Sequence, residues 1–387
     1  MFHRPSRKLS QLSGPFALVA LLATACGADR GSPAAGETRA TPLAAAPTLT
    51  PQVSGVTVRL DAISAVSDRV AWASGRSGTV LRTLDGGETW QVRPIPGAET
   101  LAFRDVQAID ADVAYVLTNN GGTNARIYKT VDGGASWTLQ FQGPPVLLFY
   151  DCFAFWSERH GVAVPDAENG RFEVLRTTDG QTWADIGDNF PVAQSGEGFF
   201  PASGTCVATW GAKRAWAVGA GAATARVFVT DDGGERWSWY PIPLGGTATS
   251  GGTTIAFRDA RHGVLGGGDV TVGTPQPNFA RSHDGGKTWA LGTAAPFAGP
   301  MYGLAYAMRP PLGGDDQDED EEGESDDGAP RRTLVATGPL GSAWSPDEGD
   351  SWQPFDPTVT GYFSVGFGSS RRGWMVGTSG RILRLDF

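Results

Sequence analysis

Six aspartates recur about every 50 residues and are the most regular set of carboxylates in the chain. They are Asp85, Asp132, Asp179, Asp232, Asp284 and Asp347. Carboxylates can act as general acids and bases, but each of these sits in a pattern of the type Thr83-Leu-Asp85-Gly-Gly87-Glu-Thr89-Trp90. Asp accepts bonds from nearby backbone N–H groups and Gly takes positive φ without strain, so this is a hairpin turn. A carboxylate committed to a turn is a poor acid–base catalyst, and we expect all six to be structural.

Each turn motif ends in a tryptophan, whose large apolar face can pack between neighbouring layers. The six are Trp90, Trp137, Trp183, Trp237, Trp289 and Trp352. Two copies of the motif are degenerate, because the third is one residue shorter and the sixth has Glu348 in place of its first Gly. GxSxG, HExxH and P-loop motifs do not occur, and His160, His262 and His283 lack metal-ligand spacing. The motifs therefore predict no catalytic residue, metal ligand or cofactor.

Short apolar segments on both sides of each turn predict the elements that position it. Each unit of about 50 residues contains four short strands, which is the signature of one propeller blade. Residues 361–387 supply three more strands and stop where a motif would begin, and residues 46–53 offer the missing outer strand. We predict an all-β fold over residues 46–387. It is a single seven-bladed β-propeller of four-stranded antiparallel blades, closed by strand exchange, with six blades as the alternative.

The N-terminus predicts an export signal over residues 1–25. Arg4, Arg7 and Lys8 precede an apolar stretch of eight residues, 16–23, which is too short to span a membrane. The segment Ala23-Thr24-Ala25-Cys26 resembles a bacterial lipobox, which implies lipidation of Cys26 and an exported protein anchored to a bacterial membrane, facing the periplasm or the cell exterior. Residues 26–45 suit a flexible tether. Ordinary secretion and a buried apolar segment are the alternatives.

Acidic residues concentrate in one insertion, residues 313–330, which interrupts the sixth unit. The formal net charge is −10, so a nucleic-acid binder is excluded, because phosphate contacts need clustered positive charge. The insertion has ten Asp and Glu, no Lys or Arg, and is expected to be disordered. Its Asp316-Asp318-Asp320 spacing is similar to a calcium loop, but Glu321 replaces the required Gly, which leaves weak calcium binding as the alternative to a solvated loop.

Two cysteines and five basic residues occupy equivalent places in different blades. Cys152 and Cys206 each precede a Trp by four residues in the first strands of adjacent blades, which favours a disulfide over two buried thiols. A basic residue stands just before four of the motifs and in the partial blade. These five residues form either a solvated or inter-blade structural set, or a basic patch for a protein partner: Arg82, Lys129, Arg176, Arg281 and Arg384.

The turn motif resembles the Asp-box, also called the bacterial neuraminidase repeat, whose role is structural. Beyond it, Arg-His-Gly-Val or Arg-Arg-Gly-Trp, a Gly turn, Ile/Val-Leu-Arg-Thr and the motif recur over residues 46–387. This wider pattern resembles the photosystem II stability/assembly factor family, known in plants as the high-chlorophyll-fluorescence assembly factor. The resemblance implies a non-enzymatic, membrane-tethered scaffold that binds protein partners during assembly of a membrane complex, without a cofactor.

Sialidases share this propeller and supply the rival function, an exo-sialidase-like glycoside hydrolase. Their Arg-Ile-Pro motif does not precede Asp85, and the nearest similar segment, Arg93-Pro-Ile-Pro96, follows the first turn. Paired carboxylates at hydrolase separation are a matter of three-dimensional geometry, so the sequence leaves this alternative open.

Overall fold

The computed structural model describes residues 45–118, 120–200, 202–309 and 332–387. The chain divides into two units, Met1–Pro42 and Leu43–Phe387, and every described residue lies in the second. The predicted signal peptide, Cys26, residues 26–44 of the predicted tether and the acidic insertion lie outside the described residues.

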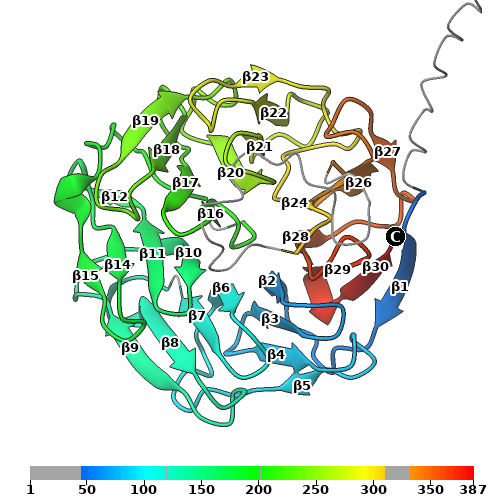
Figure 1. Cartoon of the computed structure of the whole chain (residues 1–387), viewed down its shortest axis with the longest axis horizontal. Helices are drawn as coiled ribbons and strands as arrows, with labels where there is room; N and C mark the ends of the chain where they lie inside the picture. The colour runs from blue at the N-terminus through cyan, green and yellow to red at the C-terminus, as the bar shows by residue number, and fades with distance from the viewer. Residues whose placement is uncertain (1–44, 119, 201, 310–331) are drawn as a thin grey trace, which may run out of the picture. The chain divides into compact units, whose positions relative to one another are not determined.

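Seven four-stranded antiparallel sheets surround a common axis in the second unit (Figure 1). In the first six blades the strands follow one another outward from the axis in chain order. Blades 1 and 2 contain β2 (Leu60–Ala65), β3 (Ala71–Gly75), β4 (Val80–Thr83), β5 (Gln91–Val92), β6 (Phe103–Ala108), β7 (Ala114–Thr118), β8 (Arg126–Thr130) and β9 (Thr138–Gln142). Blades 3 and 4 contain β10 (Tyr150–Ser157), β11 (His160–Pro165), β14 (Leu175–Thr177), β15 (Ala184–Asp185), β16 (Val207–Trp210), β17 (Arg214–Val218), β18 (Arg226–Thr230) and β19 (Ser238–Pro241). Blades 5 and 6 contain β20 (Ser250–Phe257), β21 (Gly263–Asp269), β22 (Phe279–Ser282), β23 (Ala290–Leu291), β24 (Gly303–Tyr306), β25 (Leu334–Gly338), β26 (Gly341–Ser345) and β27 (Gln353–Pro354).

The seventh blade joins the two ends of the propeller. Its inner strands are β28 (Tyr362–Phe367), β29 (Arg372–Gly377) and β30 (Ile382–Asp386), and its outer strand is β1 (Thr48–Gln52). Strand β1 runs antiparallel to β30, with Thr48 opposite Asp386 and Gln52 opposite Ile382. The predicted strand exchange and the count of seven blades are therefore confirmed, and the six-bladed alternative is wrong.

Small elements complete the described part of the chain. A two-stranded hairpin, β12 (Ala167–Glu168) and β13 (Arg171–Phe172), extends the turn between the second and third strands of blade 3. The helical segments among the described residues are short 3-10 turns, η1 (Gly122–Asn124), η2 (Gly187–Asn189) and η4 (Thr378–Gly380). Within the same residues, no helix is long and apolar enough to cross a membrane.

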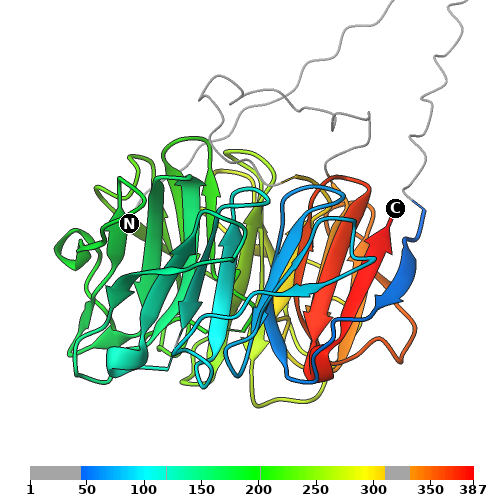
Figure 2. The ribbon, with the colours of Figure 1, turned by 90° about the horizontal axis from the view of Figure 1, so that it is seen from below.

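The propeller has two different faces, seen edge-on in Figure 2. The motif face carries the turns between first and second strands and the six turn motifs, which join third to fourth strands. The connecting face carries the turns between second and third strands and the links to the next blade, such as residues 93–102. Strand β1 begins at Thr48 on the motif face, because Thr48 lies opposite Asp386 at the end of β30.

The hydrophobic core is divided among the spaces between blades. Among the described residues it forms six apolar clusters, and each combines side chains from neighbouring blades. Fully buried tryptophans on second strands are typical members: Trp72 packs edge-on against Trp137 of blade 2, and Trp216 stacks on Phe257 of blade 5 with ring centroids 3.5 Å apart. Each blade therefore depends on its neighbours for burial of its apolar faces, as expected for a repeat architecture.

Candidate functional site

The six turn motifs share one hydrogen-bond pattern. In the first, the Thr83 hydroxyl donates to Asp85 Oδ1 at 2.8 Å and accepts the Gly87 N–H, also at 2.8 Å. Asp85 Oδ1 accepts the Thr89 N–H at 3.0 Å, and Oδ2 accepts the Thr89 hydroxyl at 2.6 Å. The shortened third motif keeps these bonds around Asp179, whereas the fourth has Arg236 in place of the hydroxyl and uses only its N–H.

These bonds hold the motif aspartates in the charged form. The hydroxyl and N–H of Thr89 lower the pKa of Asp85 to about 2, and those of Ser136 lower the pKa of Asp132 to about 2. A carboxylate whose proton affinity is this low is a poor general acid at neutral pH. The observed geometry therefore fits a structural role for the motifs.

The five recurring basic residues lie between blades. Four of them donate to the carbonyl of the residue that follows the motif aspartate in the next blade, at 3.2–3.4 Å: Lys129 to Gly180, Arg176 to Gly233, Arg281 to Glu348 and Arg384 to Gly86. Arg82 donates instead to the Ala111 carbonyl at 2.8 Å. Each also has an acidic neighbour, such as Glu235 at 2.6 Å from Arg176. Their side chains thus hold adjacent blades together, and their charge is largely compensated there.

Glu348 explains why the sixth motif departs from the pattern. It takes the position of the first Gly with φ of +61°, a backbone region that is costly for a residue with a Cβ. Its buried carboxylate accepts the Arg258 Nε–H of blade 5 at 2.8 Å and the Tyr306 hydroxyl at 2.7 Å. Arg332 Nε lies 3.5 Å from the other carboxylate oxygen. The side chain compensates for the backbone strain by tying blade 5 to the inner strand of blade 6.

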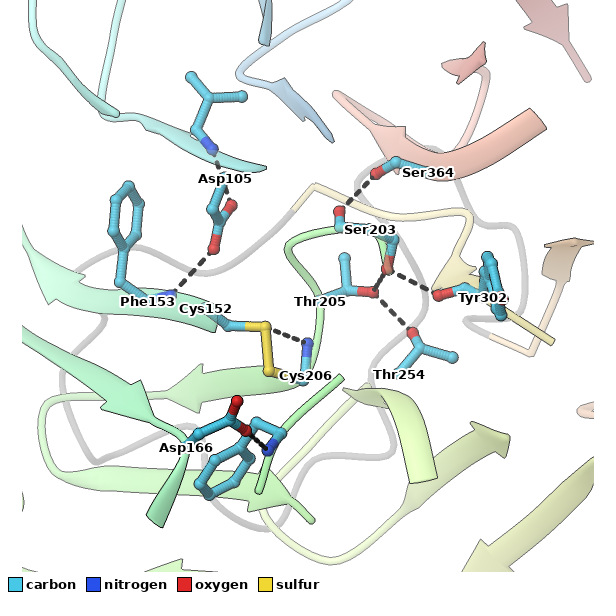
Figure 3. The surroundings of a disulfide bond; sticks show 12 residues. Asp105, Cys152, Phe153, Asp166, Ser203, Thr205, Cys206, Thr254, Tyr302 and Ser364 are labelled. Atoms are coloured by element: carbon cyan, nitrogen blue, oxygen red, sulfur yellow. Dashed lines mark hydrogen bonds between the residues drawn. A yellow bond between two sulfur atoms is a disulfide. The ribbon is translucent and has the colours of Figure 1, made fainter. Parts of the chain in front are cut away.

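Cys152 in β10 of blade 3 and Cys206, directly before β16 of blade 4, form a disulfide with Cα atoms 5.9 Å apart (Figure 3). The register of the inner strands places both at one level of the central channel. The residues at this level are Ala62, Asp105, Cys152, Cys206, Thr254, Gly303 and Ser364. Both cysteines are fully buried.

The segment before Cys206, Ser203–Thr205, crosses the channel at this level and is called the plug here (Figure 3). Ser203 Oγ donates to the Tyr302 carbonyl of blade 6 at 2.6 Å, and the Ser203 carbonyl accepts the Ser364 hydroxyl of blade 7 at 2.9 Å. Thr205 Oγ1 lies 2.7 Å from Thr254 Oγ1 of blade 5. A segment of blade 4 thus bonds to the adjacent blade 5 and, across the axis, to blades 6 and 7.

Next to the plug the channel contains a cavity of about 180 Å³, whose lining residues extend along the inner strands toward the motif face. Its lining includes one register level across all seven inner strands at which every residue but Gln107 is small: Ser64, Gln107, Ala154, Ala208, Ala256, Ala305 and Gly366. Asp105 lies at its closed end, where its carboxylate accepts the N–H groups of Val106 at 2.7 Å and Phe153 at 2.9 Å. Burial raises the pKa of Asp105 well above its ordinary value. Because the plug lies at the same end of the cavity as Asp105, it closes the channel toward the connecting face.

On the connecting face, the inner strands of five blades break register at equivalent positions. The residues in these irregularities are Asp61, Arg104, Asp151, Thr253 and Phe363. Such bulges re-aim side chains and are frequent next to functional sites. Here they put charged and aromatic groups at the mouth of the channel, in strands that are otherwise apolar.

Three arginines meet around one of these bulge residues and form the arginine site. Asp61 has no exposed surface and lies 2.6 Å from Arg59 Nε, 3.3 Å from Arg104 Nη1 and 3.9 Å from Arg76 Nε. The Arg59 guanidinium lies 3.6 Å from the centre of the Phe363 ring, in a cation–π contact that joins blade 1 to blade 7. Three cations against one carboxylate leave a formal excess of two positive charges.

The electrostatics of the arginine site follow from burial. Burial lowers the pKa of Arg59, and it raises the pKa of Asp61 against the opposing effect of the three guanidiniums. The Arg76 side chain is 48% exposed, while those of Arg59 and Arg104 are 24% and 19% exposed. The site can therefore present guanidinium N–H groups to an anionic ligand, for which arginine is well suited.

A second hollow on the connecting face, of about 450 Å³, lies between blades 3 and 4. Asp151 and Asp166 line it together with Phe149, Phe199 and other residues. Burial raises the pKa of Asp166, and hydrogen bonds with the Phe199 N–H and with Asp151 act against it. Carboxyl groups in hydrogen-bond contact are closer than the separation of about 5 Å or more that glycosidases use. This pair therefore does not match a glycosidase site.

The histidines and acids do not assemble a metal centre in the described part of the chain, where no group of three or more His, Cys, Asp or Glu could hold a metal ion. His262 Nδ1 lies 2.7 Å from Asp259 Oδ2, and His160 Nε2 lies 3.1 Å from the Gly233 carbonyl oxygen. Both histidines are thus engaged in packing and turn contacts on the motif face.

Sequence reasoning missed the arginine site and the plug. A signal for the first was present, because aligning the repeats places Asp61, Arg104 and Asp151 at equivalent positions of apolar inner strands. Nothing in the sequence marks Ser203–Thr205, because its contacts come from blades that are distant in the chain.

Comparison with known proteins shows what the chain is similar to. No family model matches it. It is 29% identical over 262 residues to the photosystem II assembly protein Ycf48 of Synechococcus sp. (strain JA-2-3B'a(2-13)), covering 56% of this chain and 70% of that relative. A second Synechococcus Ycf48, from strain JA-3-3Ab, is 27% identical over a stretch of the same length.

Solved structures show the same fold at low identity. A Ycf48 structure described as bound to a D1 peptide superposes with a TM-score of 0.59 at 16% identity, covering 89% of this chain and 96% of that one. A GH74 xyloglucanase from Xanthomonas campestris superposes with a TM-score of 0.57 at 14% identity, covering 87% of this chain and 53% of that one. Since a binding protein and an enzyme superpose about equally well, these structures establish the fold alone. Taken with the sequence similarity, the chain is an assembly-factor-like seven-bladed β-propeller, similar to the Ycf48 photosystem II assembly proteins.

Proposed function

We propose that the chain is a non-enzymatic, membrane-tethered scaffold that binds a protein partner through the connecting face of the propeller. The observation that carries the proposal is the arginine site, where Arg59, Arg76 and Arg104 surround one buried carboxylate. Similarity to the Ycf48 assembly proteins supports a partner in a membrane complex, and the Ycf48 described as bound to a D1 peptide supports a peptide segment as ligand.

The chemistry of the face defines the segment. An excess of two positive charges favours a carboxylate, either an acidic side chain or a free C-terminus, and guanidinium groups bind carboxylates through paired hydrogen bonds. Exposed apolar side chains lie on the same face: Leu147 is 71% exposed in the link between blades 2 and 3, and Leu340 is 49% exposed in blade 6. We infer that the partner segment carries a carboxylate flanked by apolar residues.

The tether is part of the proposal. Strand β1 begins on the motif face, so a tether from a lipid anchor at Cys26 would join the propeller at that face. The connecting face would then be free to bind the partner. The protein is then exported and anchored to a bacterial membrane, on its periplasmic or outer side. Replacing Cys26 by Ala should move the protein from the membrane to the soluble fraction after cell fractionation. Unchanged membrane association of this variant would contradict the lipid anchor.

Binding is tested with a labelled synthetic peptide of Leu and Glu residues with a free C-terminus, followed by fluorescence anisotropy on the full chain. Replacing Arg76 by Gln removes the most exposed guanidinium, and we expect about five- to thirtyfold weaker binding, as for loss of a charge-assisted pair of about 1–2 kcal/mol. Arg69→Gln is the matched control, because it removes one exposed arginine from the motif face. Equal weakening by both variants would show a general charge effect and refute this site.

A further inference from the structure

The plug touches the residues on which the arginine site rests. Ser203 Oγ donates to the Tyr302 carbonyl at 2.6 Å, and the Ser364 hydroxyl donates to the Ser203 carbonyl at 2.9 Å. Ser364 is the neighbour of Phe363, whose ring lies 6.0 Å from that of Tyr302 and directly under the Arg59 guanidinium. The plug therefore fixes the backbone at Tyr302 and Ser364, next to the Phe363 ring on which the Arg59 guanidinium packs.

Gly204 is a closely packed residue of the plug. Gly204 has φ of +73°, and a Cβ there would lie 2.3 Å from Asp105 Oδ1, so only glycine fits in both conformation and space. At the far end of the plug, Thr205 is followed at once by Cys206, which the disulfide fixes to blade 3. The covalent bond thus holds the end of a segment that would otherwise depend on a few hydrogen bonds.

We propose that the Cys152–Cys206 disulfide is a redox latch, which keeps the plug seated and, when reduced, loosens both the plug and the arginine site. The reaction is thiol–disulfide exchange with a dithiol. A thiolate of the dithiol attacks one cysteine sulfur, the Cys152–Cys206 bond breaks, and the second thiol resolves the mixed disulfide. The dithiol gives up two electrons and two protons and becomes a disulfide, while Cys152 and Cys206 become thiols.

Burial links the latch to occupancy of the arginine site. Both sulfur-bearing residues are fully buried, so a dithiol reaches them only when the plug moves. If release of the plug weakens the arginine site, then a ligand bound there opposes release of the plug, because coupling between two sites is reciprocal. This consequence for binding rests on the proposed function, whereas the latch itself does not.

The latch is tested by hydrogen–deuterium exchange and mass spectrometry on the full chain, oxidised and after reduction with dithiothreitol. We expect exchange at residues 203–206, 302–303 and 363–364 to become about two- to thirtyfold faster on reduction, as for coupling of moderate strength. Strands β8 and β9 should not change. Unchanged exchange at residues 203–206 would overturn the latch, and a change confined to those residues would overturn its coupling to the arginine site.

Two variants separate the plug from the chemistry of the cysteines. Gly204→Ala unseats the plug with the disulfide intact, and we expect it to speed exchange at residues 302–303 and 363–364. Thr209→Val is the matched control, because it removes another cross-blade hydrogen bond, to the Phe155 carbonyl at 2.8 Å, on the motif side. Equal effects of both variants on residues 302–303 and 363–364 would refute the pathway. The exchange measurements are made without the peptide. A protein that fails to bind the peptide can therefore still confirm or refute the latch, so failure of the proposed function and failure of the latch can be told apart.

Discussion

Replacing Glu348 by glycine restores the usual residue of the turn motif, and we expect it to destabilise the protein. The gain comes from the backbone, because φ of +61° costs a residue with a Cβ about 1 kcal/mol relative to Gly. The loss comes from the side chain, because Arg258 keeps only its neighbour Asp259 and the buried Tyr306 hydroxyl loses its acceptor. Breaking a buried ion pair costs about 3–5 kcal/mol. The net expectation is a loss of about 3 kcal/mol.

The measurement is equilibrium unfolding in guanidinium chloride, compared with a Glu348→Gln variant. Gln keeps the strained backbone and can still accept the Tyr306 hydrogen bond, so it isolates the loss of charge and should fall between wild type and Glu348→Gly. A Glu348→Gly protein as stable as the wild type, or more stable, would refute the reasoning, because strain would then outweigh the ion pairs. An unchanged m-value would show that the effect lies in the stability of the native state.

The remaining predictions concern closure, the disulfide and the motifs. A chain that starts at residue 54 lacks β1 and should unfold at lower denaturant than one that starts at residue 46, as measured by tryptophan fluorescence; equal midpoints would show that β1 is dispensable. Replacing Cys152 and Cys206 together by Ala should cost about 4 kcal/mol in unfolding free energy, from loop closure over a separation of 54 residues; a loss below about 1 kcal/mol would contradict this. The pKa of Asp85 is lower folded, about 2, than unfolded, near 4, so its contribution is present above pH 4 and lost as the pH falls toward 2. An Asp85→Asn variant should therefore lose less stability than wild type between pH 5 and pH 2, and parallel losses would argue against this linkage.

The fold was largely predictable because the motifs carry local information. An Asp-Gly-Gly turn followed by Trp specifies a hairpin and a packing face within eight residues, and six copies specify blades. The exchange of β1 into the seventh blade also followed from sequence, since residues 361–387 mirror the first blade up to the missing strand. Assigning residues 46–53 as the missing strand needed only the rule that a closed propeller leaves no unpaired strand edge.

The candidate site was less predictable because its contacts are not local. The sequence left the role of the basic set open between inter-blade contacts and a partner patch, and the structure places Arg176 and its equivalents against the next blade. The arginine site depends on bulges in β2 and β6, which shift side chains by one position. The plug depends on contacts such as Ser364 to Ser203, which are 161 residues apart. Such arrangements arise only when the ring has formed.

The exchange of β1 into blade 7 has a consequence for the time at which the protein can finish folding. During synthesis β1 emerges before every other described strand, and β30 emerges more than 300 residues later. At about 5–20 residues per second, β1 waits about 15–60 s for its partner. An unpaired strand is an aggregation hazard in that interval, and Pro51 within β1 limits it, because proline cannot donate a ladder hydrogen bond. The ring therefore closes only at the end of synthesis, and β1, the first strand made, must stay unpaired until then.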